Sequence, residues 1–164
     1  MAVTADIVES WRRPRAVVRR HMERGRSEPF AFSLLVLFLI LALIAQYPAA
    51  ARVTMLDPAI PVSPQLVAKA MGLLATIPFL YGLAALSHLV ARAFGGQGGW
   101  YGARIALFWA LLATSPLVLL GGIVAGLIGA GPQLLLVAGL TFAGFFFQWV
   151  IALIEVESPS PETE

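Results

Sequence analysis

The chain has 164 residues, of which 59% are hydrophobic and only 12% are charged. In soluble domains about a quarter of all residues are charged, so the composition excludes a water-soluble globular domain. Because the sequence contains no cysteine, it also excludes disulfides, thiolate metal sites and cysteine nucleophiles.

The formal net charge of +2 hides a strong asymmetry along the chain. Seven of the eleven basic residues precede Phe30, whereas the segment after Ile154 holds four glutamates and no basic residue. This distribution is typical of a protein oriented in a membrane and not of a nucleic-acid-binding surface.

Residues 1–29 are predicted to form a basic, partly amphipathic arm. Pro14 forbids one continuous helix, so we expect a short helix before it and a second helix that begins at it. The arm is either an interfacial helix on anionic lipid headgroups, with its tryptophan in the headgroup layer, or a basic flank that only sets orientation. Its candidate lipid- or partner-binding residues are Trp11, Arg12, Arg13 and Arg15.

Four apolar segments are long enough to cross a bilayer core of about 30 Å. The predicted transmembrane helices are 30–49, 67–93, 102–128 and 133–154, and together they form one membrane domain over 30–154. The predicted fold class is therefore an all-α, polytopic membrane helical bundle with four transmembrane helices and a short amphipathic N-terminal arm. Residues 155–164, rich in proline and glutamate, are expected to form a disordered acidic tail.

Two connections within the membrane domain carry distinct signals. The segment 50–66 has prolines at three-residue spacing, which favours an extended polyproline-type path, in either an extracytoplasmic or a re-entrant loop. The segment 94–100 is rich in glycine, which suits a tight turn with positive φ angles. It is not a phosphate-binding loop, because no strand precedes it and no Gly-Lys-Ser/Thr follows it.

Proline and small residues within the predicted spans indicate how the helices bend and pack. Pro78 and Pro116 are expected to kink their helices, and Ser115 to bond a carbonyl in the preceding turn. Small residues four positions apart favour close helix packing. These are Gly122 and Gly126 in the third span and Gly139 and Ala143 in the fourth.

The basic residues next to the spans predict the orientation. With the amino terminus inside, nine basic residues lie at the inner ends of the spans and only two, Arg52 and Lys69, at the outer ends. Four spans return the carboxyl terminus to the same side. We therefore expect a protein integral to the cell (inner) membrane with both termini in the cytoplasm.

Three polar residues near the predicted inner interface form a candidate lipid- or partner-binding cluster. His88 and Arg92 are one helical turn apart, and Arg104 approaches them across the glycine-rich turn. Together they could hold a lipid phosphate or an acidic partner segment. In the alternative interpretation they snorkel to the interface and contribute to the orientation signal.

The predicted spans contain no acidic residue, which argues against a proton relay or a cation-coupled carrier. Paired carboxylates, a nucleophile with its base and sets of metal ligands are also missing from these spans. We therefore predict no enzymatic activity, no catalytic residues, no cofactor, no bound metal and no nucleic-acid partner.

The central hairpin resembles the Yip-domain family of integral membrane proteins, named for interaction with Ypt/Rab GTPases. The resemblance rests on Tyr81-Gly82 late in a span, the glycine-containing turn and the aliphatic Ser115-Pro116 segment that continues to Gly122. The basic run Trp11-Arg-Arg-Pro14 is similar to the start of many bacterial members. The resemblance implies a polytopic helical bundle with a cytosolic amino terminus. It also implies trafficking and membrane-shaping roles in eukaryotic members, and no settled activity for bacterial-type members.

These observations predict a non-enzymatic membrane scaffold or accessory subunit. Its small-residue helix faces would bind a second copy or a larger membrane complex, and its arm would bind anionic headgroups. The alternative is a small channel or transporter module, in which proline-kinked helices open a polar path past His88.

Overall fold

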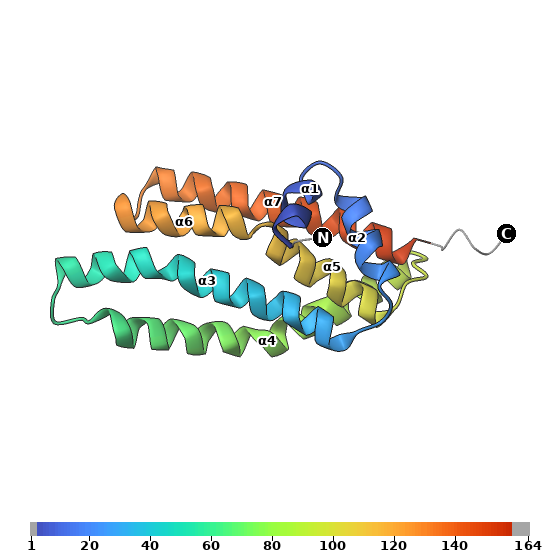
Figure 1. Ribbon diagram of the computed structural model, residues 1–164, viewed down its shortest axis with the longest axis horizontal. Coiled ribbons are helices and arrows are strands. Elements are labelled where there is room, and N and C mark those ends of the chain that lie inside the picture. The colour runs from blue at the N-terminus through green and yellow to red at the C-terminus, as the bar shows by residue number, and fades with distance from the viewer. Residues whose placement is uncertain (1–2, 159–164) are drawn as a thin grey trace.

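The computed structural model describes residues 3–158, and these residues form helices joined by short turns (Figure 1). The helices are α1 (Val3–Ser10), α2 (Pro14–Glu23), α3 (Glu28–Leu56), α4 (Val62–Ala93), α5 (Trp100–Ala113), α6 (Ser115–Leu127) and α7 (Pro132–Glu157). No strand occurs in this range, so the predicted all-α fold class is confirmed.

Three helices, α3, α4 and α7, are each long and apolar enough to cross a membrane. The consecutive helices α5 and α6 meet the same criterion together, although they are bent by 41° at the break between them. The chain is therefore an integral membrane protein with three candidate spans, or four when the bent pair counts as one. Helix α4 continues through Pro78 without a break.

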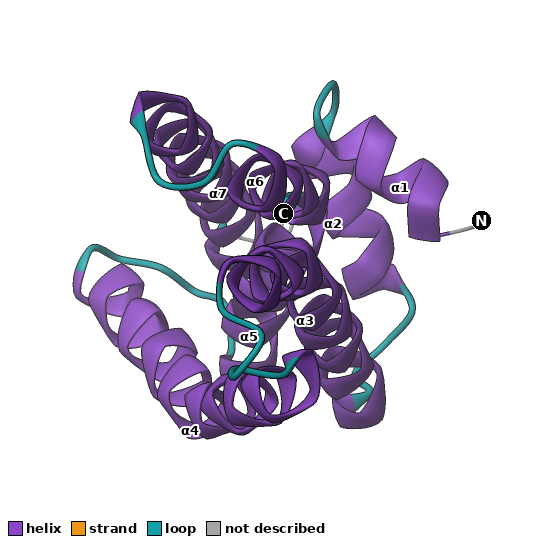
Figure 2. Cartoon of the chain, turned by 90° about the vertical axis from the view of Figure 1, so that its left-hand side faces the viewer, coloured by secondary structure: helices purple, strands orange, loops and turns teal. Residues whose placement is uncertain are grey.

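The two ends of the bundle differ. At the capped end, α1 and α2 (together the cap) lie beside α5, and the 94–99 turn and the end of α7 lie there as well (Figure 1). At the far end, turns connect α3 to α4 and α6 to α7. Figure 2 looks onto the far end and shows α3 between α4 and α6, with α7 beyond α6.

Helix α5 forms the core of the capped end because other helices surround it. Eleven of its 14 residues are buried, and Phe108 and Trp109 are fully enclosed. Helix α5 packs most extensively against α7 and α3, and it also contacts α1, α2 and α4. Lipid tails are as apolar as these side chains, so the helices are held together by close packing and polar contacts more than by the hydrophobic effect.

The bend between α5 and α6 lies at Thr114, just before Pro116. Proline has no backbone N–H and cannot bond the carbonyl four residues earlier, so α5 ends and Pro116 occupies the first turn of a new helix. Thr114, and not the predicted Ser115, bonds the preceding turn, because its Oγ1 donates to the carbonyl of Ala110 at 2.8 Å. The predicted kink in one span is thus a break into two helices.

The predicted extended connection over 50–66 is wrong for most of its length. Helix α3 continues to Leu56 and α4 begins at Val62, which leaves only 57–61 as a turn. Pro64 lies in the first turn of α4, where its missing N–H would have no helical acceptor in any case. Proline at this position therefore starts the helix and does not block it.

Helix α7 is longer than the predicted span 133–154. It begins at Pro132 and continues to Glu157, so Glu155 and Glu157 are helical, whereas the sequence assigned them to a disordered tail. The rest of that predicted tail, 159–164, lies outside the described residues. The helical extension brings two carboxylates to the capped end.

Candidate functional site

The indole of Trp11 lies in the break between α5 and α6. Its Nε1 donates a hydrogen bond to the carbonyl oxygen of Ala113, the last residue of α5, at 3.1 Å. That carbonyl lacks its usual helical donor because the amide of Leu117 bonds Thr114 instead. A Cβ on Gly144 of α7 would be only 2.7 Å from the Trp11 ring. Trp11 therefore links the N-terminal segment to the α5–α6 break. The sequence, which placed this tryptophan in the headgroup layer, did not predict this contact.

The two helices of the cap are joined by Arg20. Its guanidinium binds Asp6 at 2.7 Å and Glu9 at 2.8 Å, both on α1. The Asp6 side chain is buried at 1% exposure, where an unpaired carboxylate would be costly. These bonds hold α1 against α2 across the 11–13 turn, which Pro14 ends by starting α2.

Two further contacts join the cap to α7. Arg19 of α2 donates to Glu155 at 2.7 Å. The buried Gln148 donates to the carbonyl of Ser10, at the end of α1, at 3.0 Å. The arginine-rich segment between Ser10 and Arg19 is therefore held at both ends against one membrane helix.

An open groove of about 580 Å³ lies between this segment and the outer face of α7. Its lining residues are Arg12, Arg13, Pro14, Arg15, Ala16, Arg19, Phe147 and Ile151. Arg12, Arg13 and Arg15 are exposed, and none of them forms an ion pair or side-chain hydrogen bond within residues 3–158. The structure thus brings three of the candidate arginines together on one surface.

His88 faces a carboxylate and not a second cation. Its Nδ1 lies 2.6 Å from Oε1 of Glu157, and both side chains are buried. The other carboxylate oxygen of Glu157 accepts a hydrogen bond from the amide of Gly98 at 3.0 Å. The ring of Trp100 packs edge-on against His88, with the centroids 4.6 Å apart. This contact ties α4, the glycine-rich turn and the end of α7 together.

The predicted cationic cluster of His88, Arg92 and Arg104 is not formed as a shared anion site. Arg104 binds Glu28, in the first turn of α3, at 2.6 Å. Arg92 is exposed and makes no ion pair in the described part of the chain. The prediction considered only basic residues near the glycine-rich turn, whereas Glu28 and Glu157 reach it from the ends of other helices.

His21 of α2 is a buried histidine that the sequence did not single out. It is 1% exposed, and neither ring nitrogen has a hydrogen-bond partner. Its ring contacts Trp109 and Phe30, with centroid distances of 4.4 and 5.5 Å. Desolvation by burial lowers the pKa of His21 to about 4, although the carboxylate of Asp6 opposes this shift. His21 is thus held neutral between the cap and α5.

Acid should destabilise the fold through His21. Its pKa of about 4 in the folded state lies below the ordinary value of 6.5, so the unfolded chain binds more protons, and stability is lost as pH falls from 6.5 towards 4. At pH 5 the expected loss is on the order of 1–2 kcal/mol. Thermal unfolding of the purified protein in mild detergent, at neutral pH and at about pH 5, measures this loss.

The matched control for this prediction is His21→Phe. Phenylalanine keeps a ring between Trp109 and Phe30 but has no nitrogen to protonate, so the variant should lose less stability on acidification. If both proteins lose the same amount, the acid sensitivity arises elsewhere in the chain, and the prediction for His21 is wrong.

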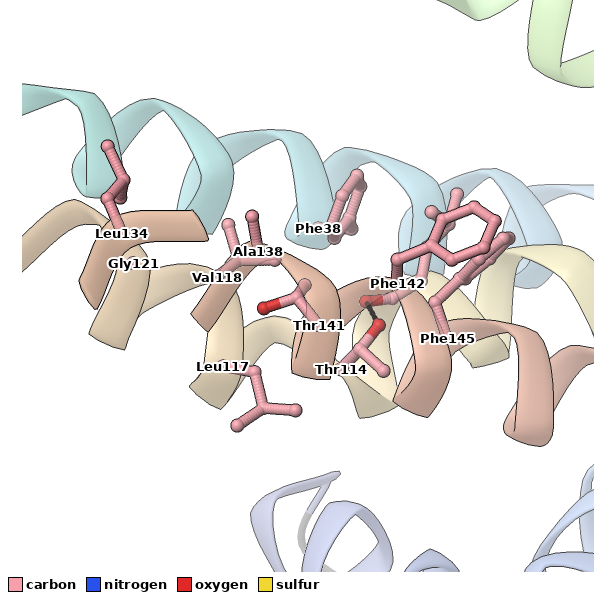
Figure 3. A pocket seen from close by; sticks show the side chains of 11 residues that line it. Phe38, Thr114, Leu117, Val118, Gly121, Leu134, Ala138, Thr141, Phe142 and Phe145 are labelled. Carbon is pink, nitrogen blue, oxygen red and sulfur yellow. Dashed lines mark hydrogen bonds between the residues drawn. The ribbon is translucent and has the colours of Figure 1, made fainter. Parts of the chain in front are cut away.

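Two cavities next to the membrane helices are apolar. One of about 370 Å³ lies beside the α5–α6 break, between α3, α6 and α7 (Figure 3). Its two hydroxyl groups, on Thr114 and Thr141, donate to carbonyls of the chain nearby. Another, of about 280 Å³, lies between α4 and α7, and its one hydroxyl, on Ser87, bonds the carbonyl of Ala84. In the described chain these polar groups therefore serve separate helix contacts and do not converge on a hydrated path past His88.

The four predicted packing residues fall into two pairs. A Cβ on Gly122 would lie 2.9 Å from the Cα of Ala45, and one on Gly126 would lie 2.8 Å from the carbonyl carbon of Pro48. Gly122 and Gly126 therefore let α6 touch the backbone of α3 within the same chain. In contrast, Gly139 and Ala143 are exposed on α7, and no atom of residues 3–158 lies within 4 Å of the position of a Gly139 Cβ.

The chemistry available at the capped end is the binding of anions. The arginine groove presents unneutralised guanidinium groups, which bind carboxylates and phosphates well. His88 and Glu157 are occupied with each other and with the glycine-rich turn. Residues 3–158 contain no group of three or more His, Cys, Asp or Glu side chains that could hold a metal ion.

The sequence profile of the Yip1 domain matches residues 8–156. The match begins near the end of α1 and ends within the last turn of α7, so it covers α2 and all the membrane helices. No curated protein and no solved structure shows a significant match to the chain. The resemblance seen in the central hairpin thus extends over nearly the whole described structure.

Proposed function

Because the chain belongs to the Yip1 domain family, whose members are generally non-enzymatic membrane proteins, we propose that it is a membrane scaffold or accessory subunit. The observation that carries this proposal is the outward strip of Gly139 and Ala143, which the described part of the chain leaves exposed. Small residues on a membrane helix allow a second helix to approach closely. The strip fits the same face of a second copy of the chain.

We propose that the capped end faces the cytoplasm, in the cell (inner) membrane. Nine basic residues lie on elements of the capped end, and two, Arg52 and Lys69, lie towards the far end. This is the distribution that the positive-inside rule associates with a cytoplasmic capped end. The channel or transporter alternative has no such support, because the two cavities of about 370 and 280 Å³ beside the membrane helices are lined almost entirely by apolar residues.

Single-cysteine cross-linking tests the scaffold proposal, since the chain has no native cysteine. In native membranes, Ala143→Cys should give a disulfide-linked dimer under mild oxidation. The control is Met71→Cys, which is also exposed on a membrane helix but lies on α4. Adding Gly139→Leu to Ala143→Cys should abolish the dimer, because the larger side chain keeps the helices apart.

Equal cross-linking at positions 143 and 71, or none at either, would overturn self-association through α7. The orientation is also tested with single introduced cysteines, here by thiol labelling. A membrane-impermeant maleimide should label Met55→Cys, at the far end of α3, in intact cells, and should not label Arg15→Cys, in the cap. The reverse pattern would overturn the proposed orientation.

A further inference from the structure

The groove between the cap and α7 combines two chemically different walls. One wall carries Arg12, Arg13, Arg15 and Arg19, of which only Arg19 has a carboxylate partner among residues 3–158. Three unneutralised cations within four positions repel one another and favour the binding of an anion. The groove is therefore a charge-complementary site for a negatively charged group.

The other wall of the groove belongs to a membrane span. Phe147 and Ile151 are one helical turn apart on α7, and Phe147 is 49% exposed. Helix α7 is apolar enough to cross the membrane, so these side chains lie on its lipid-facing surface. An occupant of the groove meets arginines on one side and an acyl-chain environment on the other.

The cap holds the arginines in place on this span. Trp11 bonds the end of α5, Ser10 is bonded by Gln148, and Arg19 is bonded to Glu155. These contacts fix the chain on both sides of the three unpaired arginines, which reduces the entropy lost when they bind a ligand. A flexible basic tail would instead respond only to the average potential of the membrane surface.

We propose that this groove binds an anionic phospholipid. The guanidinium groups of Arg12, Arg13 and Arg15 hold the phosphate, for which their planar donor geometry is suited. An acyl chain lies along Phe147 and Ile151. Unlike general attraction to the membrane surface, this assigns a defined lipid site to one helix pair, and it does not depend on self-association through Gly139 and Ala143.

The test measures the binding of phosphatidylglycerol to the full-length protein in mild detergent, by native mass spectrometry, with phosphatidylcholine as the zwitterionic comparison. The variant R12Q/R13Q/R15Q should bind phosphatidylglycerol at least about tenfold more weakly, because each arginine near a phosphate contributes substantially to binding. Phosphatidylcholine binding should change little. These side chains are exposed, so the variant should keep the wild-type elution volume and melting temperature.

The matched control is R24Q/R26Q/R92Q. It removes the same number of charges from exposed arginines at the same end of the molecule, outside the groove, and should bind phosphatidylglycerol nearly as well as the wild type. Equal weakening by the two triple variants would show diffuse attraction to the capped end and overturn the site.

A last arm separates a lipid from a soluble phosphate compound. Glycerophosphoglycerol, the headgroup without acyl chains, should fail to displace phosphatidylglycerol even in large excess, because it cannot use the apolar wall. Displacement at comparable concentrations would assign the groove to a soluble phosphate ligand and overturn the lipid proposal. The Ala143→Cys dimer should form equally well with and without R12Q/R13Q/R15Q, which keeps this test separate from that of the scaffold.

Discussion

Replacing Gly122 or Gly126 with alanine should leave little folded protein to purify. Each added Cβ would overlap the backbone of α3 at Ala45 or at Pro48. Because backbone atoms cannot rotate away as a side chain can, α3 and α6 must separate. Overpacking of this kind costs about 1–3 kcal/mol where side chains can adjust, and more is expected here. Melting temperature and monodispersity in mild detergent measure the loss.

Gly139→Ala is the matched control for these two substitutions. It makes the same chemical change in another membrane helix, but no described residue comes within 4 Å of its Cβ position. Alanine favours a helix over glycine by about 1 kcal/mol, so this variant should be as stable as the wild type or slightly more stable. If Gly122→Ala were as stable as Gly139→Ala, the close contact of α6 with α3 would be wrong.

The same contact changes how a loss of assembly is interpreted. The sequence predicted that Gly122 and Gly126 bind a second molecule or a larger complex, but the structure uses both against α3 of the same chain. A double replacement by leucine would therefore dissolve an oligomer simply by unfolding its subunits. Only substitutions on the outward strip, such as Gly139→Leu, separate association from folding.

Glu157→Ala should be the most damaging change at the capped end. It leaves His88 buried without its carboxylate and removes the acceptor of the Gly98 amide. Leaving a buried polar group without its hydrogen-bond partner typically costs about 1–3 kcal/mol, and here both His88 and the Gly98 amide lose their partner. Hydrogen exchange of the Gly98 amide should accelerate, and the melting temperature should fall.

Two further variants serve as controls for Glu157→Ala. Glu155→Ala removes the neighbouring carboxylate, but its partner Arg19 has a side chain that is 66% exposed, so the expected cost is within about 1 kcal/mol. Glu157→Gln keeps an acceptor for the Gly98 amide and should protect the turn better than alanine does. Equal stability of Glu157→Ala and Glu155→Ala would mean that the buried contact does not hold the bundle closed.

The sequence was sufficient where a local rule decides the structure. Pro14 separates two short helices, and long apolar runs give membrane helices, because proline geometry and hydropathy act within a few residues. The same local reasoning failed for 50–66, where prolines that fall in the first turn of a helix start it. The sequence correctly predicted that Pro116 disturbs its span, but it predicted a kink and not a break into two helices. The difference depends on which groups bond the carbonyls that proline leaves without a donor.

The candidate site depends on contacts between distant segments, which one sequence does not reveal. Trp11 meets Ala113, and Glu157 meets His88, only after the helices are packed. The sequence predicted that the arginines of the groove belong to a basic arm, but it did not predict that the arm packs against α7. His21 gave no signal at all, because its burial depends on Trp109 of α5.

The enclosure of α5 also sets an order of events during synthesis. The partner against which it packs most extensively, α7, follows it in the chain and is translated after it, so α5 enters the membrane before its main neighbour exists. Until α7 arrives, the glycine-rich turn lacks Glu157, and the cap lacks Gln148 and Glu155. The helices made earlier therefore remain incompletely packed until α7 inserts, and its insertion completes the core around α5 and supplies the contacts to Ser10 and Arg19.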